Sequence, residues 1–327
     1  MSSIGKCLVT GVSGFVGKAL AKELHKRGYE VVGLARREVQ DLKDLGIKVL
    51  IADISFEQNL KQEYFQGIKT VFHVAAKVDM WGDWKDFYQT NVVGTQNLIF
   101  LSKTNGVKNF IFTSSPSVVA DGTNLKGVDE SKPYPEKFLS FYPQTKVISE
   151  KFVLSSHSED FRTIALRPHL IFGPGDTGLT LIVVEKAKKG QLVIVGKGEN
   201  KVDFTFIDDC VDAHILAAQG IDKDFNVGGK PYFITQGEPY LLWEWVNKVL
   251  ACNNMPPLKK KVSLKFAFFM ASLMEFFSRI TGKEPRLTRF LVEEMATDHY
   301  FSIESARKNL GYNPKISIDE AIKVSYH

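Results

Sequence analysis

The chain has 327 residues and a formal net charge of +5. This length suits one large domain with an appended region or two closely joined domains, and a hydrophobic content of 44% excludes general disorder. The mild positive charge is compatible with an anionic small molecule. The sequence lacks the concentrated basic stripe of a nucleic-acid-binding protein, so no nucleic-acid partner is expected.

The cysteine pattern and the start of the chain indicate a reducing compartment. Cys7, Cys210 and Cys252 show no metal-ligand spacing, so we expect free thiols and no metal site. The chain enters directly into an apolar run without the pattern of a secretory signal. A cytoplasmic location is therefore the expectation.

The first half alternates short apolar runs with longer helical patterns. Strands are predicted over Cys7–Thr10, Glu30–Ala35, Lys48–Ala52, Thr70–Val74, Phe110–Ser114 and Arg162–Leu166, and helices over Phe15–Lys26, Lys85–Thr104 and Tyr142–Ser156. Strands that are apolar on both faces and alternate with helices indicate a parallel sheet covered on both sides. The predicted fold class is therefore α/β, with a doubly wound parallel sheet.

A glycine-rich turn joins the first predicted strand to the first predicted helix. Its spacing is G-x-x-G-x-x-G, and the segment that carries it comprises Gly11, Ser13, Gly14, Phe15, Val16 and Gly17. Glycines let the backbone approach a pyrophosphate, and the N-terminus of the following helix supplies N–H donors and positive potential. Because a strand precedes this pattern and a helix follows it, the sequence predicts a dinucleotide site in a Rossmann-type fold.

The end of the second strand indicates which dinucleotide binds. An acid at this position would bind the ribose hydroxyls of NAD, but the strand is followed by Arg36 and Arg37. Guanidinium groups suit a 2′-phosphate, so NADP(H) is favoured over NAD(H). The alternative is that the arginines are only solvated, with Glu38 pairing with one of them. Asp53, just after the third strand, is expected to accept a hydrogen bond from the adenine amino group or to cap a helix.

The regular alternation of strand and helix patterns ends after Arg167. Glycine and proline cluster at 173–175 and at 228–231, and helices are predicted over Trp243–Ala251, Leu264–Ser278 and Arg289–Met295. We expect residues 1–166 to form an NADP-binding Rossmann domain. Residues 167–327 are expected to form a smaller, mostly helical substrate-binding region that returns some elements to the main sheet.

Three residues form the predicted catalytic group. Ser115 follows the fifth strand, and Tyr142 and Lys146 are four residues apart, which places them on one face of a helix. A nearby ammonium is expected to lower the pKa of the tyrosine, so that Tyr142 acts as general acid or base at a carbonyl or alcohol. Ser115 is expected to orient the reacting oxygen, and Lys146 also to bind the nicotinamide ribose.

The whole chain resembles the extended short-chain dehydrogenase/reductase family, and within it the branch similar to 3β-hydroxysteroid dehydrogenases. This branch includes sterol decarboxylating dehydrogenases and 2-alkyl-3-oxoalkanoate reductases. The resemblance is carried by the glycine turn and by residues 73–77, 81–82, 91–95, 113–119, 142–146, 167–168, 173–176, 206–209 and 232–239.

The resemblance implies further residues of the cofactor site. Ala75 and Ala76 would line the cleft, Asn91 would order the active-site end of its helix, and Pro168 would present backbone to the nicotinamide amide. Ile54 and Lys77, next to members of this group, are assigned to the same site. Asn91 and Pro168 also have simpler interpretations, as a backbone partner and as the end of a strand.

These observations favour an NAD(P)(H)-dependent oxidoreductase that interconverts a secondary alcohol and a ketone on a hydrophobic substrate, either steroid-like or a 2-alkyl-3-oxo acid. Members specific for steroids and NAD carry an acid where this chain has Arg36, which favours an NADPH-driven reductase. A nucleotide-sugar 4-epimerase or reductase is the main alternative, although few groups suited to a diphosphate are well placed in the second half. A non-catalytic NADP-binding regulator is less favoured because Tyr142 and Lys146 are both present.

Residues 259–280 combine the basic run Lys259–Lys261 with an apolar stretch that contains several phenylalanines. Such a segment is typical of an amphipathic helix covering a substrate pocket, the favoured interpretation, or of a helix resting on an anionic membrane surface. Proteins similar to this chain are often dimers that pack helices such as Lys85–Thr104 and Tyr142–Ser156 across a two-fold axis. The resemblance therefore also implies a homodimer.

Overall fold

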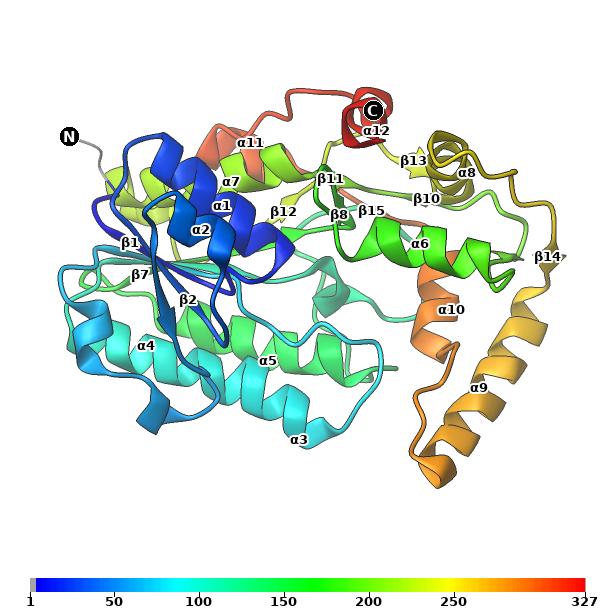
Figure 1. Ribbon diagram of the computed structural model, residues 1–327, viewed down its shortest axis with the longest axis horizontal. Helices are drawn as coiled ribbons and strands as arrows, with labels where there is room; N and C mark the ends of the chain where they lie inside the picture. Colours follow the sequence, from blue (N-terminus) through cyan, green and yellow to red (C-terminus); the bar gives the residue numbers. More distant parts are fainter. Residues whose placement is uncertain (1–3, 327) are drawn as a thin grey trace.

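The computed structural model describes residues 4–326 and is built around one seven-stranded sheet (Figure 1). In spatial order the strands are β12 (Pro231–Ile234), β7 (Arg162–Pro168), β5 (Asn109–Thr113), β4 (Thr70–His73), β1 (Cys7–Thr10), β2 (Val31–Ala35) and β3 (Lys48–Ile51). Every pairing within this sheet is parallel. The predicted doubly wound sheet is confirmed, and the six predicted strands end within one or two residues of their expected limits.

Helices cover both faces of the sheet. The helices α1 (Phe15–Lys26) and α7 (Ile207–Lys223) lie on one side, and α4 (Gly94–Thr104) and α5 (Phe141–Ser155) lie on the other (Figure 1). Along β1 the side chains alternate between the two layers, since Cys7 and Val9 join the core under α1 and Leu8 joins the core under α4. Burial on both faces explains why the strands are continuously apolar.

The other elements lie around this sheet. The helices are α2 (Gln40–Asp44), α3 (Trp84–Phe87), α6 (Leu179–Lys188), α8 (Leu242–Cys252), α9 (Leu264–Thr281), α10 (Arg289–Ala296), α11 (Glu304–Leu310) and α12 (Ile318–Tyr326). The short strands are β6 (Leu125–Val128), β8 (Ile171–Phe172), β9 (Ile194–Val195), β10 (Lys201–Val202), β11 (Thr205–Phe206), β13 (Tyr240–Leu241), β14 (Lys261–Val262) and β15 (His299–Phe301). Within residues 4–326, no helix combines the length and the apolar character that crossing a membrane requires.

The two halves of the chain exchange strands. β12 comes from the second half and extends the main sheet beside β7. In return, β6 from the first half pairs with β15, in a four-stranded sheet with β10 and β13. This exchange holds the C-terminal elements against the carboxyl edge of the main sheet, where α/β proteins bind ligands.

The long helix predicted over Lys85–Thr104 is interrupted. Between α3 and α4 the segment Tyr88–Val93 is a wider, π-helical turn. Asn91 lies inside this turn, and its main-chain carbonyl accepts hydrogen bonds from the hydroxyls of Thr95 (2.5 Å) and Ser149 (2.7 Å). Such turns occur frequently at functional sites, and here the turn directs Asn91 toward α5.

Candidate active site

The turn between β1 and α1 needs glycine for steric reasons. Gly11 has a φ of +73°, and a Cβ built on it would lie 2.8 Å from the backbone nitrogen of Ala75. A Cβ on Gly17 would collide with the carbonyl oxygen of Gly11. The turn therefore brings the backbones of β1, α1 and the segment after β4 unusually close together, as a pyrophosphate-binding turn requires.

The N-terminus of α1 is suited to an anion. Gly14 precedes the helix, is exposed, and provides no side chain to cap the first turn. Ser13, Phe15 and Val16 lie beside it and are partly buried. The N–H groups of the first turn are thus available to a ligand, and the helix dipole favours a negative charge there.

An open hollow of about 510 Å³ lies at the tips of β2 and β3, and Arg36 and Asp53 are among its lining residues. Arg37 is exposed as well but does not line this hollow. Glu38 pairs with Lys43 at 2.9 Å, which removes the acid that the sequence offered as an arginine partner. Arg36 is therefore the better placed of the two arginines for a 2′-phosphate.

Asp53 and Ile54 leave β3 in a tight turn. One carboxylate oxygen of Asp53 accepts the N–H of Ser55 at 2.9 Å, so the side chain stabilises the turn whether or not it meets an adenine. Ile54 is buried, and its carbonyl accepts a hydrogen bond from Asn97 (2.9 Å). The Ile54 side chain lies where a Cβ on Gly94 would need space, so it packs against the start of α4.

A histidine in the core supports the cleft. His73 is buried at the end of β4 and exchanges hydrogen bonds with the hydroxyls of Thr10 (2.9 Å) and Thr95 (2.9 Å). The Thr10 hydroxyl also accepts the N–H groups of Val74 and Ala75, each at 3.1 Å. Burial lowers the pKa of His73 to about 3, so the ring is neutral and serves as a structural link.

Asn91 connects the cofactor cleft to the catalytic helix. Its side-chain oxygen accepts the N–H of Lys77 (2.8 Å), and its amide nitrogen donates to the Lys77 carbonyl (3.0 Å) and to the hydroxyl of Thr145 (3.0 Å). Ala75 and Ala76 precede this clamp and are partly buried after β4. One side chain thus fixes the loop after β4 relative to the residue next to Lys146.

Ser115, Tyr142 and Lys146 come together beyond the end of β5. The Ser115 hydroxyl accepts from the N–H (3.2 Å) and hydroxyl (3.0 Å) of Ser117, and it hydrogen-bonds the Tyr142 side chain. Lys146 is 2% exposed, donates to the carbonyl of Thr113 (2.6 Å) and lies 3.9 Å from the ring centre of Phe112. Pro168, the last residue of β7, is buried opposite Ile234 of β12 at the same edge of the sheet.

The electrostatic expectation for the tyrosine is wrong in this arrangement. Burial raises the pKa of Tyr142 to about 12, the hydrogen bond to Ser115 opposes this rise, and the Glu294 carboxylate adds to it. Burial also lowers the pKa of Lys146 to about 7, against the opposing effect of Glu150. A lysine that is only partly charged and directed at a main-chain carbonyl cannot offset the desolvation of the phenolate.

The C-terminal region brings to the tyrosine a carboxylate that sequence reasoning missed, that of Glu294. Glu294 in α10 contributes a carboxylate within 4.8 Å of ring nitrogens of His169 and His299. His299 donates from Nε2 to the Glu294 carbonyl (2.8 Å), so its Nδ1 accepts from His169 Nε2 at 2.6 Å. These facing ring nitrogens are used by hydrogen bonds and are not free for a metal ion. A pair of adjacent glutamates in an apolar helix was the only sequence signal.

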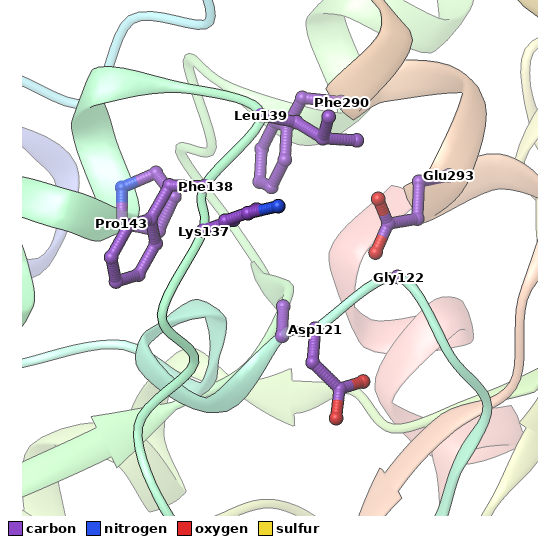
Figure 2. Close-up of a pocket in the computed structure, with 9 residues that line it drawn as sticks. Asp121, Gly122, Lys137, Phe138, Leu139, Pro143, Phe290 and Glu293 are labelled. Atoms are coloured by element: carbon purple, nitrogen blue, oxygen red, sulfur yellow. The ribbon is translucent and has the colours of Figure 1, made fainter.

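A pocket of about 160 Å³ lies between α5 and α10; Pro143, the residue after Tyr142, lines it, whereas Ser115, Tyr142 and Lys146 do not. Figure 2 shows apolar side chains on one side of it and the carboxylates of Asp121 and Glu293 on the other. Its lining residues are Ala120, Asp121, Gly122, Lys137, Phe138, Leu139, Pro143, Phe290 and Glu293. None of the phenylalanines of α9 belongs to this lining.

The fold and this site define an oxidoreductase that uses a pyridine nucleotide. The model of the 3-beta hydroxysteroid dehydrogenase/isomerase family matches residues 8–266. The chain is 39% identical over 324 residues to 2-alkyl-3-oxoalkanoate reductase of Stenotrophomonas maltophilia, with 97% of each protein covered. It is 34% identical over 325 residues to sterol-4-alpha-carboxylate 3-dehydrogenase, decarboxylating, of Homo sapiens, with 97% of this chain and 86% of that protein covered.

Solved structures share the fold. The crystal structure of gox2253 superposes with a TM-score of 0.78 at 26% identity, covering 98% of this chain and 96% of that one. UDP-glucuronic acid 4-epimerase from Bacillus cereus in complex with NAD gives 0.75 at 23% identity, covering 98% and 97%. The family model and the two relatives show that the chain belongs to the 3-beta hydroxysteroid dehydrogenase/isomerase family.

Proposed function

We propose that this protein reduces a ketone to a secondary alcohol on a hydrophobic substrate with NADPH, and that Tyr142, Ser115 and Lys146 carry out the proton chemistry. The observation that carries the proposal is the Tyr142 side chain, which is hydrogen-bonded to Ser115 and belongs to the helix whose Pro143 lines the pocket between α5 and α10. The Tyr142 hydroxyl carries its proton at neutral pH, which is the form that can donate to a carbonyl oxygen.

The residues of the cleft fit a dinucleotide. The Gly11 turn and the open N-terminus of α1 would hold the pyrophosphate, and Asp53 would meet the adenine. Arg36 would hold the 2′-phosphate, which is the basis for preferring NADP(H). When bound, the nicotinamide supplies the hydride.

The side chains of this protein handle the oxygen and its proton. Ser115 donates a hydrogen bond to the substrate oxygen and orients it, while Tyr142 transfers the proton from its hydroxyl to that oxygen. Lys146 stabilises the resulting phenolate when it carries its proton and also binds ribose hydroxyls. Asn91 keeps the helix that carries Tyr142 and Lys146 in register with the loop after β4.

Lys137 favours an oxo acid over a neutral steroid as substrate. It lines the pocket beside Phe138 and Leu139, so an ammonium lies next to apolar surface there. The acids on the other side neutralise it little, because Asp121 already binds Lys132 (2.7 Å) and burial raises the pKa of Glu293 to about 7. A 2-alkyl-3-oxo acid presents the matching combination of alkyl chains and carboxylate, as the substrate name of the Stenotrophomonas relative also suggests.

The direct test measures oxidation of a 2-alkyl-3-hydroxy acid with NADP⁺, because the oxo acid decarboxylates spontaneously. A 3-hydroxysteroid with NADP⁺ and UDP-glucose with NAD⁺ are the comparison substrates. We expect turnover of the hydroxy acid with NADP⁺. Turnover of UDP-glucose alone, or of no alcohol by a protein that binds NADP⁺, would overturn the proposal.

A substitution at Lys137 separates the two hydrophobic substrate types. Lys137→Gln should raise KM for the hydroxy acid roughly tenfold and leave that for the steroid unchanged, because only the acid loses an ion pair. Lys126→Gln, at an exposed lysine of β6 that does not line the pocket, is the matched control. An equal effect of Lys137→Gln on both substrates would contradict carboxylate recognition by this side chain.

A further inference from the structure

Helix α9 carries an apolar stripe on its outer surface. Phe266, Phe269, Phe276, Phe277 and Ile280 are each between 53% and 67% exposed. At 100° per residue these five positions fall within an arc of about 100°. They therefore form one face, called here the α9 stripe, which also includes the partly covered Leu273.

The opposite face of α9 is the one that packs. Ala267, Ala271, Glu275 and Ser278 are buried against the body of the protein, and Glu275 binds Arg289 at the start of α10 (2.8 Å). In Figure 1 α9 descends beside α10 at the margin of the molecule, away from the main sheet. The stripe is consequently the side of the helix that no other described element covers.

Basic side chains surround the stripe. Seven exposed basic residues lie between positions 259 and 286, and Glu284 is the only exposed acid among the described residues of this range. The basic residues are Lys259, Lys260, Lys261, Lys265, Arg279, Lys283 and Arg286. Aromatic side chains rimmed by lysine and arginine are the pattern of a helix that rests on anionic lipid.

We propose that α9 docks on an anionic membrane surface, with the α9 stripe inserted among the acyl chains near the headgroups and the basic residues facing those headgroups. A second copy of the chain is a poorer occupant, because a symmetric contact would bring the two basic rims together. The helix lies in the plane of the surface, since its opposite face is held by α10. Through α10, which carries Phe290 and Glu293, docking brings the pocket close to the bilayer; this last step rests on the proposed function.

The test is flotation of the full-length protein with vesicles, without cofactor or substrate. We expect binding to vesicles of phosphatidylcholine with phosphatidylserine, weak binding to phosphatidylcholine alone, and release at high salt. The double variant Phe269→Ser/Phe276→Ser should reduce binding roughly tenfold or more because it removes inserted apolar surface. Lys259→Glu/Lys260→Glu should reduce binding to anionic vesicles only.

Matched controls separate lipid binding from loss of structure. Phe56→Ser/Phe100→Ser removes two exposed phenylalanines outside α9 and should leave vesicle binding unchanged. All variants should keep the thermal unfolding temperature of the unmodified protein, as expected for exposed side chains. Absence of binding to anionic vesicles, equal binding by the stripe variant, or a change from dimer to monomer in the stripe variant with no lipid effect would overturn the proposal. Because no turnover is measured, these outcomes are independent of the proposed reaction.

Discussion

The carboxyl edge of the main sheet and the α9 region differ in how their side chains are satisfied. At the sheet edge, Asn91, His73 and Lys146 are buried and hydrogen-bonded, so each polar group has a fixed neighbour. On α9 the large apolar side chains face outward with nothing described over them. The polar groups at the sheet edge are thus satisfied within the chain, whereas α9 exposes apolar surface of the kind found at interaction sites. Substitutions at the sheet edge should therefore lower kcat and leave vesicle binding unchanged. Substitutions on the α9 stripe should lower vesicle binding and leave kcat unchanged.

The strongest expected effect lies at the sheet edge. Tyr142→Phe removes the proton donor and should lower kcat roughly 10³-fold while NADPH affinity stays within about twofold. Kinetics with a soluble ketone and a fluorescence titration with NADPH measure the two quantities. The stripe variant of α9 should retain full kcat in the same assay. An equal loss of kcat in both variants, or an unchanged kcat in Tyr142→Phe, would contradict the proposal that catalysis depends on the sheet edge and not on α9.

The Asn91 clamp gives the second largest effect. Asn91→Ala removes the side-chain partner of the Lys77 N–H and carbonyl and one hydrogen bond to the Thr145 hydroxyl, at a cost of about 1–3 kcal/mol for buried polar groups. We expect lower thermal stability and a kcat reduced by roughly tenfold or more as α5 loses its register. Thr104→Ala removes an exposed hydroxyl on the same helix assembly and should change neither quantity. Unchanged kcat in a destabilised Asn91→Ala would limit the residue to a structural role.

Glu293 tests how burial affects a charge between the two regions, because it is buried in α10 and lines the pocket. Its pKa is raised to about 7 from 4.5, so the folded protein binds this proton more tightly and loses stability as pH rises from about 4.5 to 7. Glu293→Gln should be neutral near pH 4.5 and stabilising near pH 8, by at most about 3 kcal/mol. Unfolding at both pH values measures this difference. A gain at low pH that disappears at high pH would show the opposite sign and contradict the burial of the charge.

The smallest effect is expected at the exposed end of the cofactor cleft. Arg36→Ala should weaken NADPH binding roughly tenfold and leave NADH binding unchanged, since only the 2′-phosphate loses a partner. Arg37→Ala, which does not alter the hollow, is its control. A parallel loss for NADPH and NADH would show that Arg36 contacts the adenine and not the phosphate.

The sheet, the glycine turn and the grouping of Ser115, Tyr142 and Lys146 were accessible from sequence because each depends on local patterns. Alternation of strands and helices fixes the order of elements, and the Tyr142–Lys146 spacing lies within one helix. The contribution of α10 was not accessible, because Glu294 acts on Tyr142 from a helix about 150 residues later in the chain, next to the strand β15 that pairs with β6. The pKa of Tyr142 was also missed because desolvation depends on the packed surroundings and not on the neighbour four residues away. The π-helical turn at Asn91 could not be predicted either, because its sequence contains no glycine or proline that would indicate an interrupted helix.

The pairing of β6 with β15 also has a consequence for how the protein is made. The glycine turn, Ser115 and Tyr142 are synthesised before α10 and β15, which follow Tyr142 by about 150 residues. A nascent chain can thus complete most of the nucleotide cleft while the edge of β6 and one wall of the pocket are still missing. The pocket gains Phe290 and Glu293 only after α10 has been made, and until β15 follows, β6 lacks the strand that pairs with it.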